Sequence, residues 1–357
     1  MSNLISDIAF YLEVNDTLNT FQKLVSWVEE IKEQNHSTAA ALFIMKDNEV
    51  VLEHYSGKHS NTENSTPITA SSQFNVASAR KSYLGLAVAY ALYEGKIKNL
   101  DDYAADYFKD YDKDLLGKTT LRHLVTHSHG LNEKVDGTIY REFEPGKGWA
   151  YRDINVRMMT HLINQLYNTS FPTLLKKRIF IPAGFKETGW RKKHHENLVK
   201  VIVNPHEEAI CSTGILDDGT EKNLFVSARE FAYWGNLHLN EGYLNGKQIV
   251  PKEVIKIATS LQSPKYENMD LPQNGCFWFV QNTPALQSEL GERVPKGSYQ
   301  ILGITGPTIL VIPEYNVVVA KMYNKRYNYG GDNYLYYLRE FSNLVADTFS
   351  KSSFTYQ

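Results

Sequence analysis

Cysteine and unbalanced charge are both scarce in this 357-residue chain. The only cysteines are Cys211 and Cys276, and neither belongs to a Cys-x-x-Cys pair. This excludes a disulfide-stapled scaffold, and we expect both thiols to stay reduced. Lys and Arg number 38 against 40 Asp and Glu, which gives a formal net charge of −2. A balance this even offers no general attraction for nucleic acid or anionic lipid.

Long apolar runs and cofactor motifs are missing as well. The longest wholly apolar stretch, 39–45, is too short to span a bilayer. The first residues show neither the basic nor the apolar region of a signal peptide, so we expect a cytoplasmic protein. No nucleotide-binding glycine loop and no Gly-x-Ser-x-Gly elbow occurs, and His127-Ser-His129 lacks the Asp-His of a metallo-hydrolase motif. We therefore expect no metal and no organic cofactor.

The order of the expected elements indicates an α+β fold. Apolar residues at helical spacing predict a helix over 17–33, and two apolar runs around Asp47-Asn48 predict a β-hairpin over 39–55. The middle of the chain has a mainly helical pattern. The β pattern then returns, and an amphipathic helix closes the chain. The predicted late strands cover 276–280, 299–302, 308–312 and 316–322, and the predicted closing helix covers 334–349.

Both ends of the chain are expected to build one antiparallel sheet. Residues 1–70 and 275–357 would form an α/β part, with the N- and C-terminal helices on one face of the sheet. The mainly helical part, about 71–274, would cover the other face as an inserted subdomain. Residues 1–357 would then be a single domain, with a cleft where the two parts meet.

Ser78 and Lys81 give the sharpest chemical signal, a Ser-x-x-Lys tetrad at the start of an apolar helix over 78–93. A spacing of three places the two side chains on one face of a helix. A serine hydroxyl is a weak nucleophile that needs a base, and a buried lysine can be neutral for part of a reaction cycle. The helix N-terminus would favour negative charge developing at Ser78. The tetrad also occurs by chance, so it needs support from other segments.

Tyr151 provides a second element, in the stretch Pro145-Gly-Lys-Gly-Trp149-Ala-Tyr151-Arg-Asp153. The Pro-Gly pair makes a turn that Trp149 can anchor. A phenol beside an ammonium group can have its pKa lowered, and it can then act as a general base or acid. The alternative interpretation is a purely structural tyrosine in a turn.

Gly303-Ile304-Thr305-Gly306-Pro307 provides a third element. Acyl transfer needs two backbone N–H groups aimed at the developing oxyanion, and that of the nucleophile, Ser78, is one of them. Pro307 has no N–H to offer. Ile304 can supply the second donor, and Gly303 before it allows close approach of the backbone. The alternative is an ordinary hairpin with a glycine at a bulge.

Taken together and in this order, the three elements resemble the serine β-lactamase-like and penicillin-binding-protein-like superfamily, in its class C β-lactamase and esterase branch. The resemblance covers about 39–324. It implies a β-lactamase/transpeptidase-like fold, with Ser78 as nucleophile and with Lys81 and Tyr151 as a coupled base and proton shuttle. Other stretches that agree with this branch are 121–131 (LRHLVTHSHGL), 144–153, 178–190 (RIFIPAGFKETGW) and 227–242.

The chain departs from the family pattern at two places. The Tyr-x-Asn of the family is Tyr151-x-Asp153 here, and Asp153 could accept a hydrogen bond from Lys81 and favour its ammonium form. In place of Lys-Thr-Gly, the late segment is closer to the 6-aminohexanoate-dimer hydrolase type and has Ile301-Leu302-Gly303. That removes a cation that would bind a substrate carboxylate. A rival alignment on Lys296-Gly297-Ser298 puts the lysine far from Gly303.

The resemblance and the residues together predict a serine hydrolase that acts on a small-molecule ester or amide through an acyl-Ser78 intermediate. Trp149, Asp153 and Gly303 are expected to support the site or bind substrate. One alternative is a β-lactamase, or a D-alanyl carboxypeptidase of the penicillin-binding type. Another is a catalytically weak ligand-binding or sensor domain, which Asp153, Ile301 and Pro307 favour.

Overall fold

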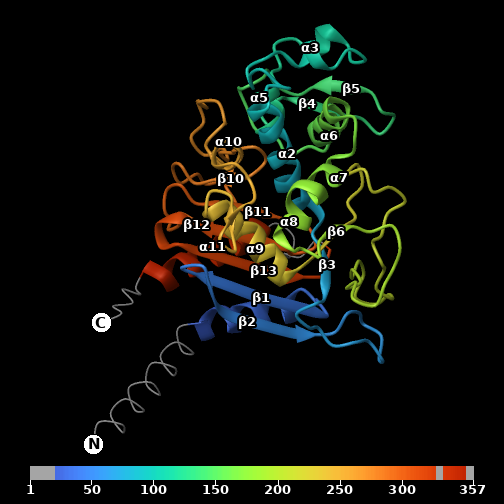
Figure 1. The fold of residues 1–357 in the computed structure, drawn as a ribbon, viewed down its shortest axis with the longest axis vertical. Helices are drawn as coiled ribbons and strands as arrows, with labels where there is room; N and C mark the ends of the chain where they lie inside the picture. The colour runs from blue at the N-terminus through green and yellow to red at the C-terminus, as the bar shows by residue number, and fades with distance from the viewer. Residues whose placement is uncertain (1–20, 327–332, 351–357) are drawn as a thin grey trace, which may run out of the picture.

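A six-stranded antiparallel sheet forms the centre of the computed structural model, which describes residues 21–326 and 333–350 (Figure 1). The strand order is β10-β11-β12-β13-β1-β2, so the first hairpin pairs with the last strand along the chain. The strands are β1 (Ala39–Lys46), β2 (Glu49–Gly57), β10 (Phe279–Val280), β11 (Tyr299–Leu302), β12 (Thr308–Ile312) and β13 (Val317–Tyr323). The expected sheet of the two chain ends is therefore confirmed.

Local sequence explains most of these strand limits. Asp47 and Asn48 both have positive φ, 52° and 69°, as a tight hairpin turn requires between right-twisted strands. The strand expected over 276–280 is wrong in extent, since only its last two residues pair with β11. Phe277 has φ 66° and donates its N–H to Val125 O in the helical part, which diverts the backbone from the sheet.

The two faces of the sheet pack against different helices. On one face, Leu42 and Ile44 join a core with the helical residues 21–34 and with α11 (Tyr334–Ser350). On the other face, β1 and β13 pack against α9 (Ala228–Leu239) in the larger core. The arrangement of terminal helices on one face and helical middle on the other is as expected. The first residues of the helix predicted over 17–33, residues 17–20, lie outside the described residues.

The helical part is built around α2 (Lys81–Tyr93), which is buried on almost every side. It packs against α10 (Lys252–Thr259) and α6 (Ile154–Tyr167). Tyr83 on α2 stacks on Trp234 of α9, with ring centroids 4.0 Å apart. These contacts fix the start of α2 firmly between the sheet and the helices.

Short elements complete the described chain. The helical ones are η1 (Ala77–Arg80), α3 (Ala104–Tyr107), α4 (Lys113–Leu116), α5 (Leu121–Val125), α7 (Phe171–Leu175), η2 (Lys176–Phe180), α8 (Ile181–Ala183) and η3 (Pro313–Tyr315). The strands are β3 (Gln73–Asn75), β4 (Leu131–Glu133), β5 (Ile139–Arg141), β6 (Gly189–Trp190), β7 (Leu224–Ser227), β8 (Tyr243–Leu244) and β9 (Lys247–Gln248). Of these, β3, β7 and β6 form a small sheet that leads the chain into η1.

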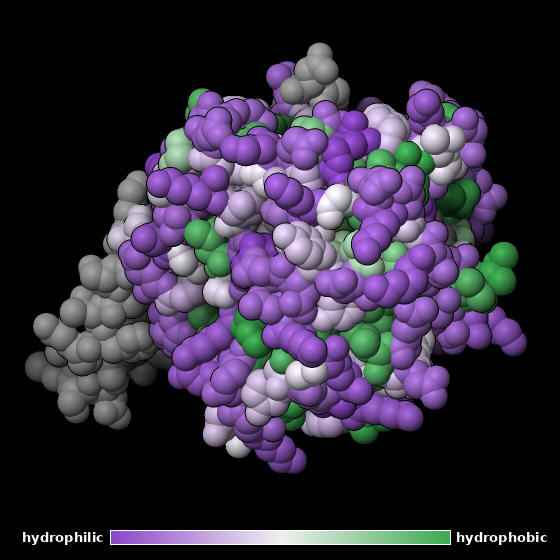
Figure 2. All heavy atoms as spheres, turned by 90° about the horizontal axis from the view of Figure 1, so that it is seen from above, coloured by the Kyte–Doolittle hydropathy of each residue, from purple (hydrophilic) through white to green (hydrophobic). Residues whose placement is uncertain are grey.

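The described part of the chain has free thiols and a mainly hydrophilic face. Cys211 and Cys276 are both free. Among the described residues, no helix combines the length and apolar character needed to cross a membrane. Figure 2 shows one face that is mainly hydrophilic, with apolar side chains in small separate groups. That face therefore presents no broad apolar patch to a partner.

Candidate active site

Ser78 lies in a tight turn that the preceding strand positions. The turn is η1, and the α-helix proper begins only at Lys81 instead of at Ser78 as predicted. Ala77 has φ 44°, a left-handed conformation that costs energy for a residue with a Cβ. Its N–H donates to Asn75 Oδ1 at 2.8 Å, and Asn75 Nδ2 donates to Lys222 O at 2.8 Å. These bonds stabilise the strained turn that presents the Ser78 side chain to a cleft.

Lys81 and Tyr151 meet beside Ser78, although 70 residues separate them in the chain. Lys81 Nζ lies 2.6 Å from the Tyr151 hydroxyl and 4.3 Å from the centre of its ring. Lys81 is completely buried, whereas Tyr151 is 37% exposed and lines the cleft. The Ser78 side chain lies near enough to the Tyr151 hydroxyl to lower its pKa. Lys81 and Tyr151 are therefore in contact, and Ser78 and Tyr151 line the same cleft.

Burial decides the protonation of this group. It lowers the pKa of Lys81 well below its usual range, and the neighbouring guanidinium of Arg80 lowers it further, while Asp153 opposes the shift. Although part of the Tyr151 side chain is exposed to the cleft, the protein around its hydroxyl desolvates it and raises its pKa above that of a free phenol, and the nearby Ser78 side chain opposes this rise. The lowered phenol pKa expected from the sequence is therefore wrong. The arrangement favours a neutral amine beside a neutral phenol.

His127 holds Tyr151 in place, which sequence reasoning did not predict. Its ring stacks on that of Tyr151 at 4.8 Å between centroids and 26° between planes. His127 O accepts the N–H of Ala150 at 3.0 Å, and Asn155 Nδ2 lies 3.1 Å from His127 Nδ1. Burial lowers the pKa of His127 well below 6.5, and the nearby charge of Lys81 lowers it further. The ring is thus neutral, and it packs against Tyr151 without adding a charge beside Lys81.

Trp149 and Asp153 flank Tyr151 and contact other loops. Trp149 Nε1 donates to Asn274 Oδ1 at 2.8 Å, which ties the Tyr151 segment to the loop before β10. Asp153 accepts an ion-pair hydrogen bond from Lys222 Nζ at 2.6 Å. A bond from Lys81 to Asp153, which the sequence allowed, is not formed, since Lys81 donates to Tyr151. Asp153 therefore acts on Lys81 through its charge alone.

Glu289 is a second residue that the sequence did not suggest. Burial raises the pKa of its carboxyl to about 8, and the charge of Lys81 opposes the rise. Among the described residues, no hydrogen bond reaches its buried Oε2 atom. A lone glutamate in a loop carries no motif, so only the folded chain reveals an acid close enough to affect Lys81.

The segment after β11 packs closely against the turn that contains Ser78. A Cβ placed on Gly303 would lie 2.2 Å from Val76 O, so only glycine fits this close to the Ser78 turn. Thr305 Oγ1 donates to Asn75 O at 2.7 Å and fastens the two segments together. Between these contacts lies Ile304, which lines the cleft, and its N–H forms no hydrogen bond with the described residues. A backbone N–H without an internal acceptor at the wall of the cleft is compatible with an oxyanion donor.

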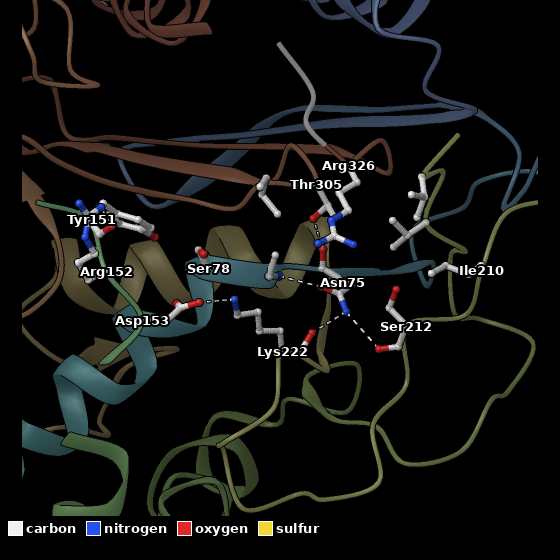
Figure 3. A pocket seen from close by; sticks show the side chains of 14 residues that line it. Asn75, Ser78, Tyr151, Arg152, Asp153, Ile210, Ser212, Lys222, Thr305 and Arg326 are labelled. Carbon is white, nitrogen blue, oxygen red and sulfur yellow. Dashed lines mark hydrogen bonds and ion pairs between the residues drawn. The ribbon is translucent and has the colours of Figure 1, made fainter. Parts of the chain in front are cut away.

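The cleft that contains these groups has a volume of about 450 Å³. Figure 3 shows Tyr151 at one end, Ile210 and Arg326 at the other, and Ser78 between them. The side chain of Ile301 is buried away from the cleft and Lys296 is exposed, so neither lines it. The lining residues are Asn75, Ala77, Ser78, Tyr151, Arg152, Asp153, Val201, Val203, Ile210, Ser212, Lys222, Ile304, Thr305 and Arg326.

Comparison with known proteins assigns this geometry to a family. A family model described as Beta-lactamase matches residues 24–342. An uncharacterized protein of Alkalihalophilus pseudofirmus is 42% identical over 327 residues, which cover 92% of this chain and 96% of that protein. A putative penicillin-binding protein of Bacillus subtilis is 24% identical over 272 residues, 70% of this chain and 65% of that protein.

Solved structures agree on the fold. A penicillin-binding protein homologue from Caulobacter crescentus superposes with a TM-score of 0.70 at 17% identity, covering 90% of this chain and 97% of that one. EstCE1, described as a hydrolase with promiscuous acyltransferase activity, gives a TM-score of 0.67 at 16% identity, with coverage of 90% and 99%. The chain therefore belongs to the β-lactamase family and has its β-lactamase/transpeptidase-like fold.

Proposed function

We propose that the protein is a serine hydrolase that cleaves a small-molecule ester or amide through an acyl-Ser78 intermediate. The observation that carries the proposal is the 2.6 Å contact between Lys81 Nζ and the Tyr151 hydroxyl beside Ser78, in a setting that lowers the pKa of Lys81. A buried free amine is a base, and a neutral phenol between base and nucleophile is a proton carrier.

Acylation follows from this arrangement. The Ser78 hydroxyl gives its proton through Tyr151 to the Lys81 amine, while Ser78 Oγ forms a bond to the substrate carbonyl carbon. The backbone N–H groups of Ser78 and Ile304 stabilise the oxyanion of the tetrahedral intermediate. The intermediate collapses by breaking the bond to the leaving group, which takes up the proton that Lys81 returns through Tyr151.

Deacylation uses the same groups with water in place of the Ser78 hydroxyl. Water gives a proton through Tyr151 to Lys81, and its oxygen bonds to the acyl carbon. The second intermediate collapses, Ser78 Oγ recovers a proton, and the acid product leaves. Both halves of the cycle require the Lys81 amine to be free at the start, which its burial favours.

The β11 segment favours a simple ester or amide over a β-lactam. Where a family member with Lys-Thr-Gly has a cation, this chain has Ile301, and that side chain is buried in the core. A carboxylate beside the scissile amide of a penicillin would therefore find no cation from β11. We expect a chromogenic cephalosporin to be hydrolysed more slowly than a nitrophenyl ester of a short acid.

The test is the kcat/KM for nitrophenyl esters in the intact protein and in Ser78→Ala. Loss of a catalytic nucleophile removes a factor of about 10⁴ or more, because the remaining groups act as a unit with it. Ser71→Ala, which removes a serine hydroxyl that does not line the cleft, is the matched control. Undiminished turnover in Ser78→Ala would overturn the proposal.

A further inference from the structure

Arg80, which lies between Ser78 and Lys81 in the chain, has a side chain that the proposed chemistry does not use. It is 4% exposed, and it does not line the cleft. Among the described residues, no hydrogen bond reaches its buried Nη1 atom. A buried cation is unfavourable unless it is paired and hydrogen-bonded, so the burial of this guanidinium needs a physical reason.

Another arginine of the chain shows the usual arrangement. Arg122, which is less buried, binds the two carboxylate oxygens of Asp101 at 2.6 and 2.9 Å. The charge of Asp153 acts on Arg80, but Asp153 forms its ion pair with Lys222 Nζ at 2.6 Å. Within the described part of the chain, Arg80 is therefore buried without an ion pair of its own.

The start of α2 makes a second cation there more unfavourable still. Arg80 is the N-cap residue of α2, and Lys81 is its first residue. The N-terminal end of a helix carries a partial positive charge, which disfavours cations near it. A guanidinium keeps its proton in a protein, whereas a buried lysine can lose its own. Of these two neighbouring groups, Lys81 is thus the one that becomes neutral.

Charged groups from several segments act on Lys81. The charges of Arg80 and Lys222 lower its pKa, whereas those of Asp153 and Glu289 raise it, and the charge of Arg80 has the largest effect of the four. Lys222 and Asp153 act in opposite directions. The carboxyl of Glu289 has a pKa of about 8, so it is mostly protonated at pH 7 and opposes Arg80 only weakly.

The other titratable neighbours of Lys81 carry no charge at pH 7. The Tyr151 hydroxyl contacts Lys81 Nζ, and His127 stacks on the Tyr151 ring. Desolvation raises the pKa of Tyr151 and lowers that of His127, so both are neutral. Arg80 therefore remains the main charge that opposes a proton on Lys81.

We propose that Arg80 is a positioning residue whose buried guanidinium keeps the Lys81 amine free of a proton. The inference deepens the proposed function and rests on it, because acylation of Ser78 starts from a free amine. Once Lys81 has accepted the proton, repulsion by Arg80 favours its return through Tyr151 to the leaving group. No bond of Arg80 itself forms or breaks.

The pH dependence of ester hydrolysis tests this role. Arg80→Met keeps an aliphatic side chain and removes the charge. We expect the acid limb of its kcat/KM profile to move to higher pH by about one unit or more, because a nearby charge shifts a pKa by about 1–3 units. Arg80→Lys should lie between the parent and Arg80→Met, since a buried lysine is only partly protonated. The shift in Lys222→Met should be smaller, because the Lys222 side chain is 54% exposed.

Arg293→Met is the matched control, since it also removes one positive charge, from a side chain that pairs with Asp347 on α11 and does not line the cleft. Its acid limb should stay at the parental pH. A parental acid limb in folded Arg80→Met would overturn the inference while leaving the hydrolase proposal intact. Failure of both Arg80→Met and Arg80→Gln to fold would overturn it too, because the guanidinium would then be a structural group.

A protein that hydrolyses no ester would instead contradict the proposed function. Protonation of Lys81 is then followed by NMR, through the Cε resonance that is absent from Lys81→Met. A pKa of Lys81 below that of the exposed lysines in the parent, raised by about one unit or more in Arg80→Met, would support the inference. The same pKa in both proteins would overturn it.

Discussion

Gly303→Ala should separate the reacting groups without disturbing the rest of the fold. The new Cβ would lie 2.2 Å from Val76 O, 3.0 Å from Val76 C and 3.3 Å from the Cβ of Ala77. Two of these neighbours are backbone atoms, so no side-chain rotation can relieve the contact. Gly303 has no positive φ, so the change adds no backbone strain of its own. The chain must open between the Ser78 turn and the end of β11.

The size of the effect follows from that distance. A carbon and a carbonyl oxygen approach to about 3.3 Å at closest, so the segments must separate by about 1 Å. A displacement of about 1 Å in a reacting geometry costs roughly 10²-fold, and loss of one oxyanion donor costs about 10²- to 10³-fold in kcat. Overpacking of this kind lowers the free energy of unfolding by about 1–3 kcal/mol.

The assay combines kcat for a nitrophenyl ester with thermal unfolding. Gly189→Ala is the matched control, because its Cβ would first meet the flexible end of Arg191 at 3.3 Å and not the backbone. We expect Gly303→Ala to fold, with a fall in kcat much larger than its fall in stability would explain. Parental kcat in a folded Gly303→Ala would refute the placement of Ile304 as oxyanion donor.

Two further predictions concern Tyr151 and Lys81. His127→Ala removes the ring that stacks on Tyr151 and should lower kcat by about 10²-fold, while His127→Phe should restore much of it, as measured by ester kinetics with KM followed separately. Because Lys81 must be neutral to act, kcat/KM should fall as pH drops through its pKa. Asp153 raises that pKa and Lys222 lowers it, so Asp153→Asn should move the acid limb to lower pH and Lys222→Met to higher pH. Shifts of one sign in both pH–rate profiles would contradict the electrostatic account.

The sheet was predictable because its strands carry strong local signals. Apolar runs with turn residues between them predicted β11 and β12 to the residue, and Asp47-Asn48 predicted the hairpin turn. The short β10 was not predictable, because the backbone contact between Phe277 and Val125 that ends it joins residues far apart in the chain. Local pattern therefore defined the strands except where tertiary contacts interrupted them.

In the candidate site, too, local motifs predicted some residues, whereas contacts between distant segments determine the others. Ser78, Lys81 and Tyr151 belong to motifs, and the order of these motifs and their resemblance to the β-lactamase-like superfamily predicted that the three residues meet. His127, Glu289 and the pairing of Asp153 with Lys222 depend on burial and on contacts between distant segments. The predicted shift of the Tyr151 pKa was wrong in direction for that reason. The sequence places a cation near the phenol, but it does not show the desolvation of the hydroxyl, which outweighs the effect of the cation.

Mass spectrometry of the intact protein tests the central claim most directly. After a brief reaction with an activated ester or a fluorophosphonate, we expect one added group, located on Ser78 by peptide mapping and absent in Ser78→Ala. Lys81→Met and Tyr151→Phe should slow its formation by about 10²-fold or more, since each removes part of the proton path. A group attached at another residue, or equal labelling of Ser78→Ala, would contradict the account.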